Sequence, residues 1–148
     1  MKKIFVAAPF YHWIQDDETK NEKRNILEQL LKSLREQGYK VYNAHEREKW
    51  GDAWLDGDIC TPLDYKEISD SNLIIAFAGP PISGGVYIEL GWSSSMKKKI
   101  LLILQENEEY SNLVIGLNKI TDVKYLYVGG ETSTHISKVV LKEIEGWV

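Results

Sequence analysis

The sequence predicts a single α/β domain, a three-layer sandwich in which a five-stranded parallel sheet lies between two layers of helices. Short, unbroken apolar runs such as residues 73–78 and 100–104 are typical of strands buried on both faces. Segments with helical spacing separate these runs, and alternating strands and helices indicate a parallel sheet. A length of 148 residues suits one domain with its own core, so residues 1–148 are assigned to it.

The first elements follow from apolar patterning. Residues 3–8 predict the first strand, and residues 10–20 are expected to form a loop that opens into a helix. Leucines and isoleucines at helical spacing predict a helix over residues 25–37, which Gly38 ends. A short second strand is predicted over residues 39–42.

The polar segment of residues 43–62 is the longest stretch without a predicted element. Loops of this length in compact domains are usually functional lids or disordered, and the two tryptophans of this segment argue against disorder. A helix is then predicted over residues 61–71, with Thr61 as its cap and Pro62 at its first position, where proline is well tolerated.

Residues 73–104 form the centre of the predicted fold. A strand, a glycine turn, a helix over residues 86–96 and another strand make one βαβ unit with a right-handed crossover expected. The glycine turn lies at the carboxyl end of the sheet, where open α/β folds bind ligands. A last strand over residues 123–128 and a closing helix over residues 133–147 complete an arrangement that resembles flavodoxin-like and Rossmann-like folds.

The composition excludes several classes of function. A formal net charge of −4 gives no general attraction to nucleic acid. No apolar run approaches the roughly 20 residues that a membrane-spanning helix needs. The single cysteine, Cys60, excludes an internal disulfide framework, and a cytoplasmic location is expected. No Cys, His and carboxylate cluster has metal-ligand spacing, so neither a metal nor another cofactor is expected.

The glycine turn carries two features of chemical interest. The N–H groups of Gly84, Gly85 and Val86, together with the Ser83 hydroxyl, form a candidate cradle for a phosphate. Glu89 follows in an otherwise apolar stretch and is expected to project near the bound group. The alternative is purely structural, with Ser83 as a helix cap and Glu89 as a charge that complements the helix dipole.

Three stretches, in this order along the chain, resemble the nucleoside 2-deoxyribosyltransferase family. They are the strand and turn IFVAAPF, the helix and strand DYKEISDSNLIIAF that contains Asp64, and the turn and helix SGGVYIELG that contains Glu89. The resemblance covers roughly residues 3–117 and implies that Glu89 and Asp64 are catalytic. For Asp64, the alternative is a charge at the start of a helix.

The residue six positions before Glu89 places the chain within this family. Transferases that use free nucleosides commonly carry aspartate there, whereas this chain carries Ser83. A serine at this position resembles the pattern of the branch that hydrolyses nucleoside 5′-monophosphates. A hydroxyl does not repel phosphate as a carboxylate would. Ser111 resembles a serine of that branch that reaches the phosphate from a neighbouring subunit, which implies a homodimer with a shared site. The segment AHEREKWG is similar to the CMP and hydroxymethyl-CMP N-glycosidases of the branch.

The resemblance implies hydrolysis of the N-glycosidic bond of a small-molecule nucleotide, with Glu89 attacking C1′ to form a glycosyl-enzyme. Asp64 would orient Glu89 or the sugar and help to move a proton. His45 is a candidate to hydrogen-bond the base, although a lone histidine is more often structural. The aromatic residues that could stack on the base, or simply pack, are Phe10, Tyr11 and Trp50.

Three other functions fit parts of this pattern. A nucleoside 2-deoxyribosyltransferase would transfer the sugar to a second base. A phosphoribohydrolase of the lysine-decarboxylase-like group also combines a glycine turn with a glutamate, but its PGGxGTxxE pattern is interrupted here by Val86 and Tyr87. A nucleotide-binding sensor without catalysis would gain nothing from burying Glu89 beside an anion.

Overall fold

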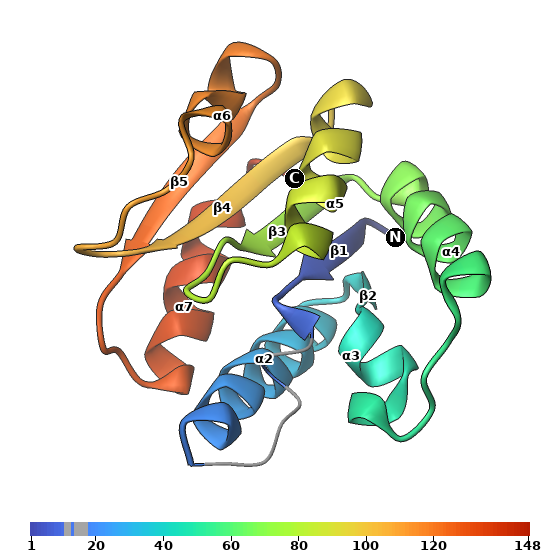
Figure 1. Cartoon of the computed structure of the whole chain (residues 1–148). Helices are drawn as coiled ribbons and strands as arrows, with labels where there is room; N and C mark the ends of the chain where they lie inside the picture. Colours follow the sequence, from blue (N-terminus) through green and yellow to red (C-terminus); the bar gives the residue numbers. More distant parts are fainter. Residues whose placement is uncertain (11–12, 14–17) are drawn as a thin grey trace.

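Figure 1 shows the computed structural model, which describes residues 1–10, 13 and 18–148. In this part of the chain, five strands form one parallel sheet in the order β2-β1-β3-β4-β5. The predicted α/β fold and its five strands are confirmed, with strand ends that shift by no more than one residue. The strands are β1 (Lys3–Ala7), β2 (Lys40–Tyr42), β3 (Leu73–Phe77), β4 (Lys99–Gln105) and β5 (Val123–Val128).

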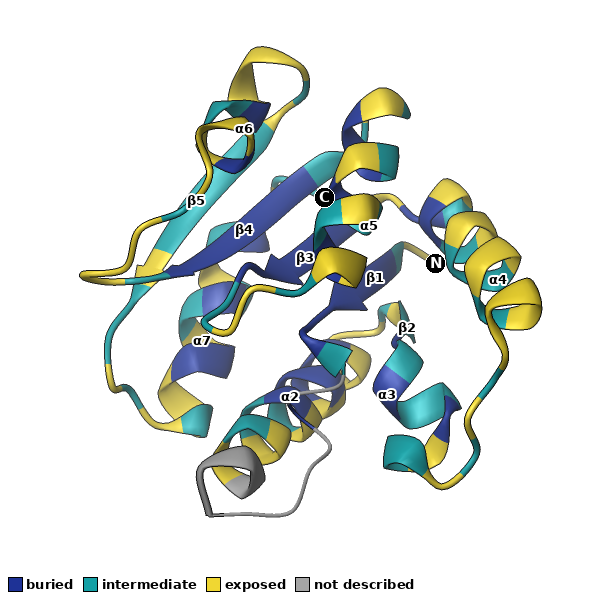
Figure 2. Cartoon of the chain, viewed as in Figure 1, coloured by how far each residue is buried: buried dark blue, intermediate teal, exposed yellow. Residues whose placement is uncertain are grey.

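Helices cover both faces of the sheet. Apolar residues of α2 (Glu18–Glu36) and α7 (Ser133–Ile144) pack on one face. Apolar residues of α4 (Gly57–Asp70), α5 (Gly84–Ser95) and α6 (Asn112–Ile115) pack on the other, and η2 (Gly116–Lys119) follows α6. Figure 2 shows the central strands buried between these layers, as expected of strands in a doubly covered parallel sheet.

The order of the strands creates a switch point between β1 and β3. These two strands are neighbours, but the chain leaves β1 toward α2 on one face and leaves β3 toward α5 on the opposite face. A crevice outside the carboxyl ends of the strands is expected where connections diverge in this way. The predicted glycine turn therefore lies beside this crevice.

The starts of two helices differ from the sequence prediction. The first helix, predicted over residues 25–37, begins at Glu18, because its opening turns contain good helix formers without apolar periodicity. The helix predicted over residues 61–71 begins at Gly57, so Thr61 is not its cap and Pro62 lies inside the helix. Pro62 is exposed and close to the amino end, where its missing N–H removes a single hydrogen bond.

The ends of two other helices also shift. The helix after the glycine turn begins at Gly84 rather than at residue 86, because the glycine N–H groups belong to its first turn. The closing helix ends at Ile144 rather than at residue 147, just before Gly146, which has a φ of 71°. No helix in the described part of the chain combines the length and the apolar character needed to cross a bilayer.

The segment of residues 43–62 is not the long loop that the sequence predicts. It contains a one-turn helix, α3 (Ala44–Arg47), the 3-10 turn η1 (Lys49–Gly51) and the start of α4. Asn43 caps α3 by accepting the Glu46 N–H at 3.0 Å, and its Nδ2 donates to the Val6 carbonyl at 3.0 Å. These bonds fix α3 to β1, although α3 has no apolar periodicity that could have revealed it.

Candidate active site

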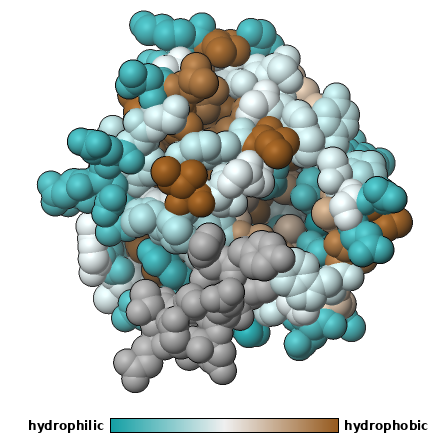
Figure 3. Space-filling model, viewed as in Figure 1, coloured by the Kyte–Doolittle hydropathy of each residue, from teal (hydrophilic) through white to brown (hydrophobic). Residues whose placement is uncertain are grey.

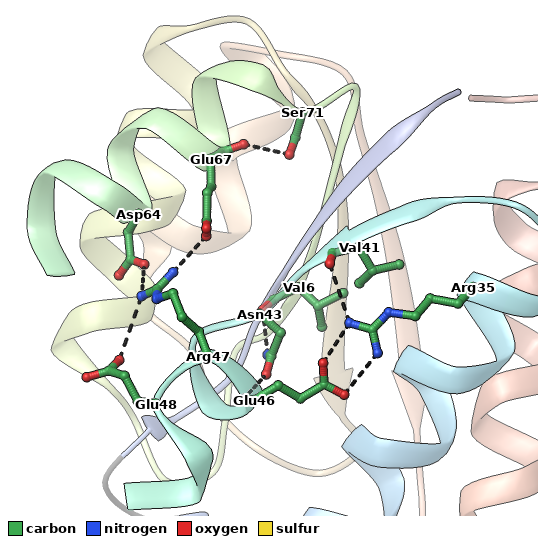
Figure 4. Close-up of polar contacts among 10 residues, drawn as sticks. All are labelled: Val6, Arg35, Val41, Asn43, Glu46, Arg47, Glu48, Asp64, Glu67 and Ser71. Carbon is green, nitrogen blue, oxygen red and sulfur yellow. Dashed lines mark hydrogen bonds and ion pairs between the residues drawn. The ribbon is translucent and has the colours of Figure 1, made fainter. Parts of the chain in front are cut away.

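Three acidic side chains surround the guanidinium of Arg47 at the carboxyl edge of the sheet. Arg47 Nη2 donates to Asp64 Oδ1 at 2.6 Å and Nη1 donates to Glu67 Oε2 at 2.7 Å, while Glu48 Oε2 lies 3.7 Å from Nη2 (Figure 4). The side chains of these four residues are all at least four-fifths buried. A fourth acid, Glu89 on α5, has a pKa that burial and the charge of Asp64 raise well above its ordinary value, against the charge of Arg47. Asp64 and Glu89, predicted separately from the sequence, thus belong to one cluster.

Packing between α4 and α5 brings these acids together. The rings of Tyr65 and Trp92 meet edge to face, with centroids 5.4 Å apart. Tyr65 is the neighbour of Asp64, and Trp92 lies three residues after Glu89 on the same side of α5. The contact between the two rings therefore holds the two helices together beside the carboxyl groups.

Burial determines the protonation of the acidic cluster. Burial raises the pKa of Glu89 well above its ordinary value. The negative charges of Asp64 and Glu67 raise this pKa further, whereas the positive charge of Arg47 lowers it. Burial also raises the pKa of Asp64 and of Glu67, against the hydrogen bonds and charge of Arg47. Carboxyl groups with raised pKa values, gathered at the carboxyl edge of an α/β sheet, are typical of an active site.

Arg47, Glu48 and Glu67 were missed as site residues in the sequence. Glu67 lies one turn after Asp64 and therefore on the same face of α4, which is the signal that could have revealed it. Arg47 and Glu48 lie in the segment AHEREKWG, but nothing in their spacing indicates that they point toward α4. Among the described residues, no three His, Cys, Asp or Glu side chains are arranged to hold a metal ion.

The predicted base-binding aromatic residues meet around His45. The His45 ring lies 4.7 Å from Phe10 and 5.2 Å from Trp50 between centroids, and Arg24 stacks over Trp50 at 4.5 Å. The Trp54 ring centroid lies 5.1 Å from that of Phe10, and Trp54 is half exposed. Tyr11, also predicted to contact the base, lies outside the described residues.

His45 is buried and neutral. Only 1% of its surface is exposed, and neither ring nitrogen has a well-formed hydrogen bond. Burial lowers its pKa to about 4, although the backbone of Pro9 and Phe10 favours the charged ring. Because α3 carries both His45 and Arg47, the aromatic group and the acidic cluster are attached to the same short helix.

The glycine turn before α5 contains the helix cap that the structural alternative predicted. Ser83 is the N-cap of α5, and its Oγ accepts the Val86 N–H at 3.4 Å. The Val86 N–H, which the sequence assigned to the candidate phosphate cradle, therefore already bonds to the serine hydroxyl. Gly84 and Gly85 are exposed, and a side chain added at Gly84 would meet nothing within 4 Å. Because they begin α5, their N–H groups lie at the positive end of the helix dipole.

Ser111 is exposed and lies at the start of α6, where its Oγ accepts the Leu113 N–H at 3.2 Å. It makes no described contact with Ser83 or Glu89 in the same chain. The preceding Tyr110 ties this region to the glycine turn, since its hydroxyl donates to the Gly79 carbonyl and accepts the Gln105 N–H, both at 2.7 Å.

A separate groove of about 920 Å³ lies on the opposite face of the sheet. It runs between the start of α2 and the loop before α7, and Lys23, Pro81 and Thr132 help to line it. Asp64 and Glu89 do not line this groove. The acidic cluster and the groove are therefore two distinct regions of the surface.

Three solved structures resemble this chain over nearly its whole length. The CMP N-glycosidase BcmB of Clostridium botulinum is 33% identical, with a TM-score of 0.72 over 95% of this chain and 99% of its own. BlsM is 32% identical, with a TM-score of 0.75 over 97% of this chain and 92% of its own. A conserved protein from Enterococcus faecalis V583 is 19% identical, with a TM-score of 0.67 over 100% of this chain and 99% of its own. At this identity the likeness supports the fold alone. No protein-family model and no curated protein sequence matches the chain.

The low pKa of His45 predicts how stability depends on pH. The native ring stays neutral down to about pH 4, whereas the histidine of the unfolded chain takes up a proton near its ordinary value of 6.5. The unfolded state thus binds more protons between these values, and the free energy of unfolding falls as the pH falls. Between pH 7 and pH 4, the wild type should lose about 3 kcal/mol more than His45→Gln.

Denaturant titrations of both proteins at the two pH values measure this difference. All other titrating groups are shared, so their contributions cancel. An equal loss of stability in the two proteins would show that His45 is not held neutral by burial.

Proposed function

Because the chain belongs to the N-glycosidase branch of the nucleoside 2-deoxyribosyltransferase family, we propose that it hydrolyses the N-glycosidic bond of a nucleoside 5′-monophosphate. The products are a free base and a (deoxy)ribose 5-phosphate. The observation that carries the proposal is the pairing of Asp64 and Glu89 in one buried cluster at the carboxyl edge. A CMP-type substrate is favoured, because the similar protein BcmB is a CMP N-glycosidase.

Glu89 is assigned as the nucleophile. Its carboxylate oxygen forms a bond to C1′ as the C1′–N bond breaks, and the electron pair of that bond leaves with the base, which takes up a proton. Water then attacks C1′, loses a proton and releases the Glu89 carboxylate. Asp64, held by Arg47, is the neighbouring group that can carry these protons.

The turn before α5 is assigned to the 5′-phosphate. Ser83 caps the helix, while the exposed N–H groups of Gly84 and Gly85 lie at its positive end. An anion at this position gains from both hydrogen bonds and the helix dipole. The aromatic group around His45 is assigned to the base, because a flat ring can stack there on Phe10 or Trp50.

The functional unit is assigned as a homodimer. Figure 3 shows several separate apolar patches on the face of the molecule that carries α5 and α6. The exposed apolar residues of α5, α6 and the loop before α5 include Ile82 and Ile88, each more than half exposed, and Leu113, which is 85% exposed. A second copy of the chain would cover these side chains. Ser111 lies beside Leu113 at this surface, where a second copy would bring it toward the neighbouring site.

The variant Glu89→Gln tests the assignment of the nucleophile. Glutamine keeps the size of the side chain but cannot attack C1′, so turnover should fall by about a thousandfold or more, while folding and nucleotide binding remain. Release of free base by chromatography measures the turnover, and Glu109→Gln, at an exposed position, is the matched control. Near-normal turnover in Glu89→Gln would rule out the covalent mechanism.

A substrate panel tests the phosphate site and the reaction type together. CMP should be cleaved about ten- to a hundredfold more efficiently than cytidine, because a charge-assisted hydrogen bond typically contributes ~1.5–3 kcal/mol. Each substrate is incubated with and without a second free base as acceptor. Equal efficiency on CMP and cytidine would contradict the role of Ser83, and formation of a new nucleoside or nucleotide would identify a transferase. The panel also includes the other nucleoside monophosphates, and if every nucleotide stays intact, the result favours a nucleotide-binding sensor without catalysis.

Subunit mixing tests the shared site. Glu89→Ala and Ser111→Ala proteins are mixed under conditions that exchange subunits. Random exchange makes about half of the dimers mixed, and each mixed dimer then has one site with both defects and one with neither. Activity at low substrate should exceed the average of the two parents. If exchange is verified and activity stays at that average, Ser111 does not serve its neighbour.

A further inference from the structure

The hydroxyl of Tyr110 bridges β4 and the chain that follows β3, where the two strands separate. The parallel ladder continues one bond past the end of β3, from the Ala78 N–H to the Ile103 carbonyl at 3.0 Å. At the next step the Gln105 N–H donates to the Tyr110 hydroxyl at 2.7 Å, and this hydroxyl donates to the Gly79 carbonyl at 2.7 Å. One side chain therefore ties the end of β4 to the start of the glycine turn.

The glycine turn folds tightly back on itself at Gly79. This residue has a φ of 112°, and a Cβ at its position would lie 2.6 Å from the Pro81 carbonyl oxygen and 3.2 Å from the Ile82 nitrogen. The position of Gly79 therefore determines where the backbone that follows it can lie. That backbone leads directly to Ser83, the N-cap of α5, and to the N–H groups that are assigned to the phosphate.

The turn depends on Tyr110 for its attachment to the sheet. In the described part of the chain, residues 79–82 make no other hydrogen bond to a different segment. Without the hydroxyl, a main-chain donor and a main-chain acceptor would lose their partner, and the Ser83 cap would loosen. The rest of α5 stays packed on the sheet through Val86 and Leu90, which are buried on either side of Glu89. The nucleophile is therefore held independently of the turn.

We propose that Tyr110 is a positioning residue that holds the glycine turn in the shape that binds the 5′-phosphate. It acts through Gly79 and Ser83 rather than by contact with the substrate. This inference rests on the proposed function, in which the amino end of α5 receives the phosphate. Loss of the hydroxyl should therefore weaken the discrimination between a nucleotide and its nucleoside, while the cleavage of the nucleoside stays nearly unchanged.

Tyr110→Phe removes only the hydroxyl and tests the inference by a ratio. The kcat/KM for CMP divided by that for cytidine should fall by about fivefold or more, mainly through a higher KM for CMP. A general loss of stability would lower both efficiencies alike, so the ratio separates positioning from structural support. Titration with inorganic phosphate, followed by the amide NMR signals of Gly84 and Gly85, measures the same site without turnover. The Kd for phosphate should rise by about the same factor.

The chain offers a matched control in Tyr125. Its hydroxyl also bridges two main-chain groups, because it donates to the Ile115 carbonyl and accepts the Asn118 N–H at 3.3 Å. These partners belong to α6 and η2 and not to the glycine turn. Tyr125→Phe reports the general effect of removing such a hydroxyl, and it should leave both the ratio and the Kd for phosphate in place.

The outcomes separate this inference from the proposed function. A ratio that is the same in the wild type and Tyr110→Phe, or that falls equally in Tyr125→Phe, overturns the inference. Where cytidine is not cleaved, the phosphate titration takes the place of the ratio; where nothing is cleaved, the proposed reaction fails and the titration still decides. A raised Kd in Tyr110→Phe alone supports the positioning of the turn. Equal Kd values, or no binding of phosphate at Gly84 and Gly85, overturn it.

Discussion

The site depends on one constraint of the fold, the divergence of the chain at the carboxyl ends of β1 and β3. Parallel pairing brings both ends to the same edge, and the following helices then lie on opposite faces. A crevice at this point needs no special sequence, because it follows from the strand order. The sequence determines only which side chains surround it, from the glycine turn on one side to α3 on the other.

The buried ion pairs of Arg47 fit a functional role better than a stabilising one. The free energy needed to remove a guanidinium and several carboxylates from water offsets much of the free energy gained from their attraction. Well-packed apolar residues would often give an equally stable protein. Arg47 nevertheless forms ion pairs with Asp64, Glu67 and Glu48, and its Nε is buried without a hydrogen bond. Such an arrangement is expected where the charge state of a site matters more than the free energy of folding.

The parts that could be predicted from the sequence are those with periodic apolar patterns or a strong turn signal. The apolar strands and the Ser83 cap belong to this class. Asp64 was singled out by the resemblance to the family, and the catalytic roles of Asp64 and Glu89 stay predictions. α3 could not be predicted, because a single turn has no periodicity and depends on Asn43 reaching back to Val6, far away in the chain. Arg47 could not be assigned for the same reason: its partners lie 17 and 20 residues further along and meet it only after folding.

The geometry of α5 reconciles a negative cluster with a negatively charged substrate. Ser83 caps the helix and Glu89 follows six residues later, so the two lie about 9 Å apart along the axis at 1.5 Å per residue. A nucleotide lying along this helix would place its phosphate at the positive end and its sugar beside Glu89, away from direct repulsion between the two anions. A carboxylate in place of Ser83 would remove this separation of charge. The serine and the acids therefore form one electrostatic arrangement, in which the amino end of α5 would accept the phosphate and the middle of the helix would face the sugar.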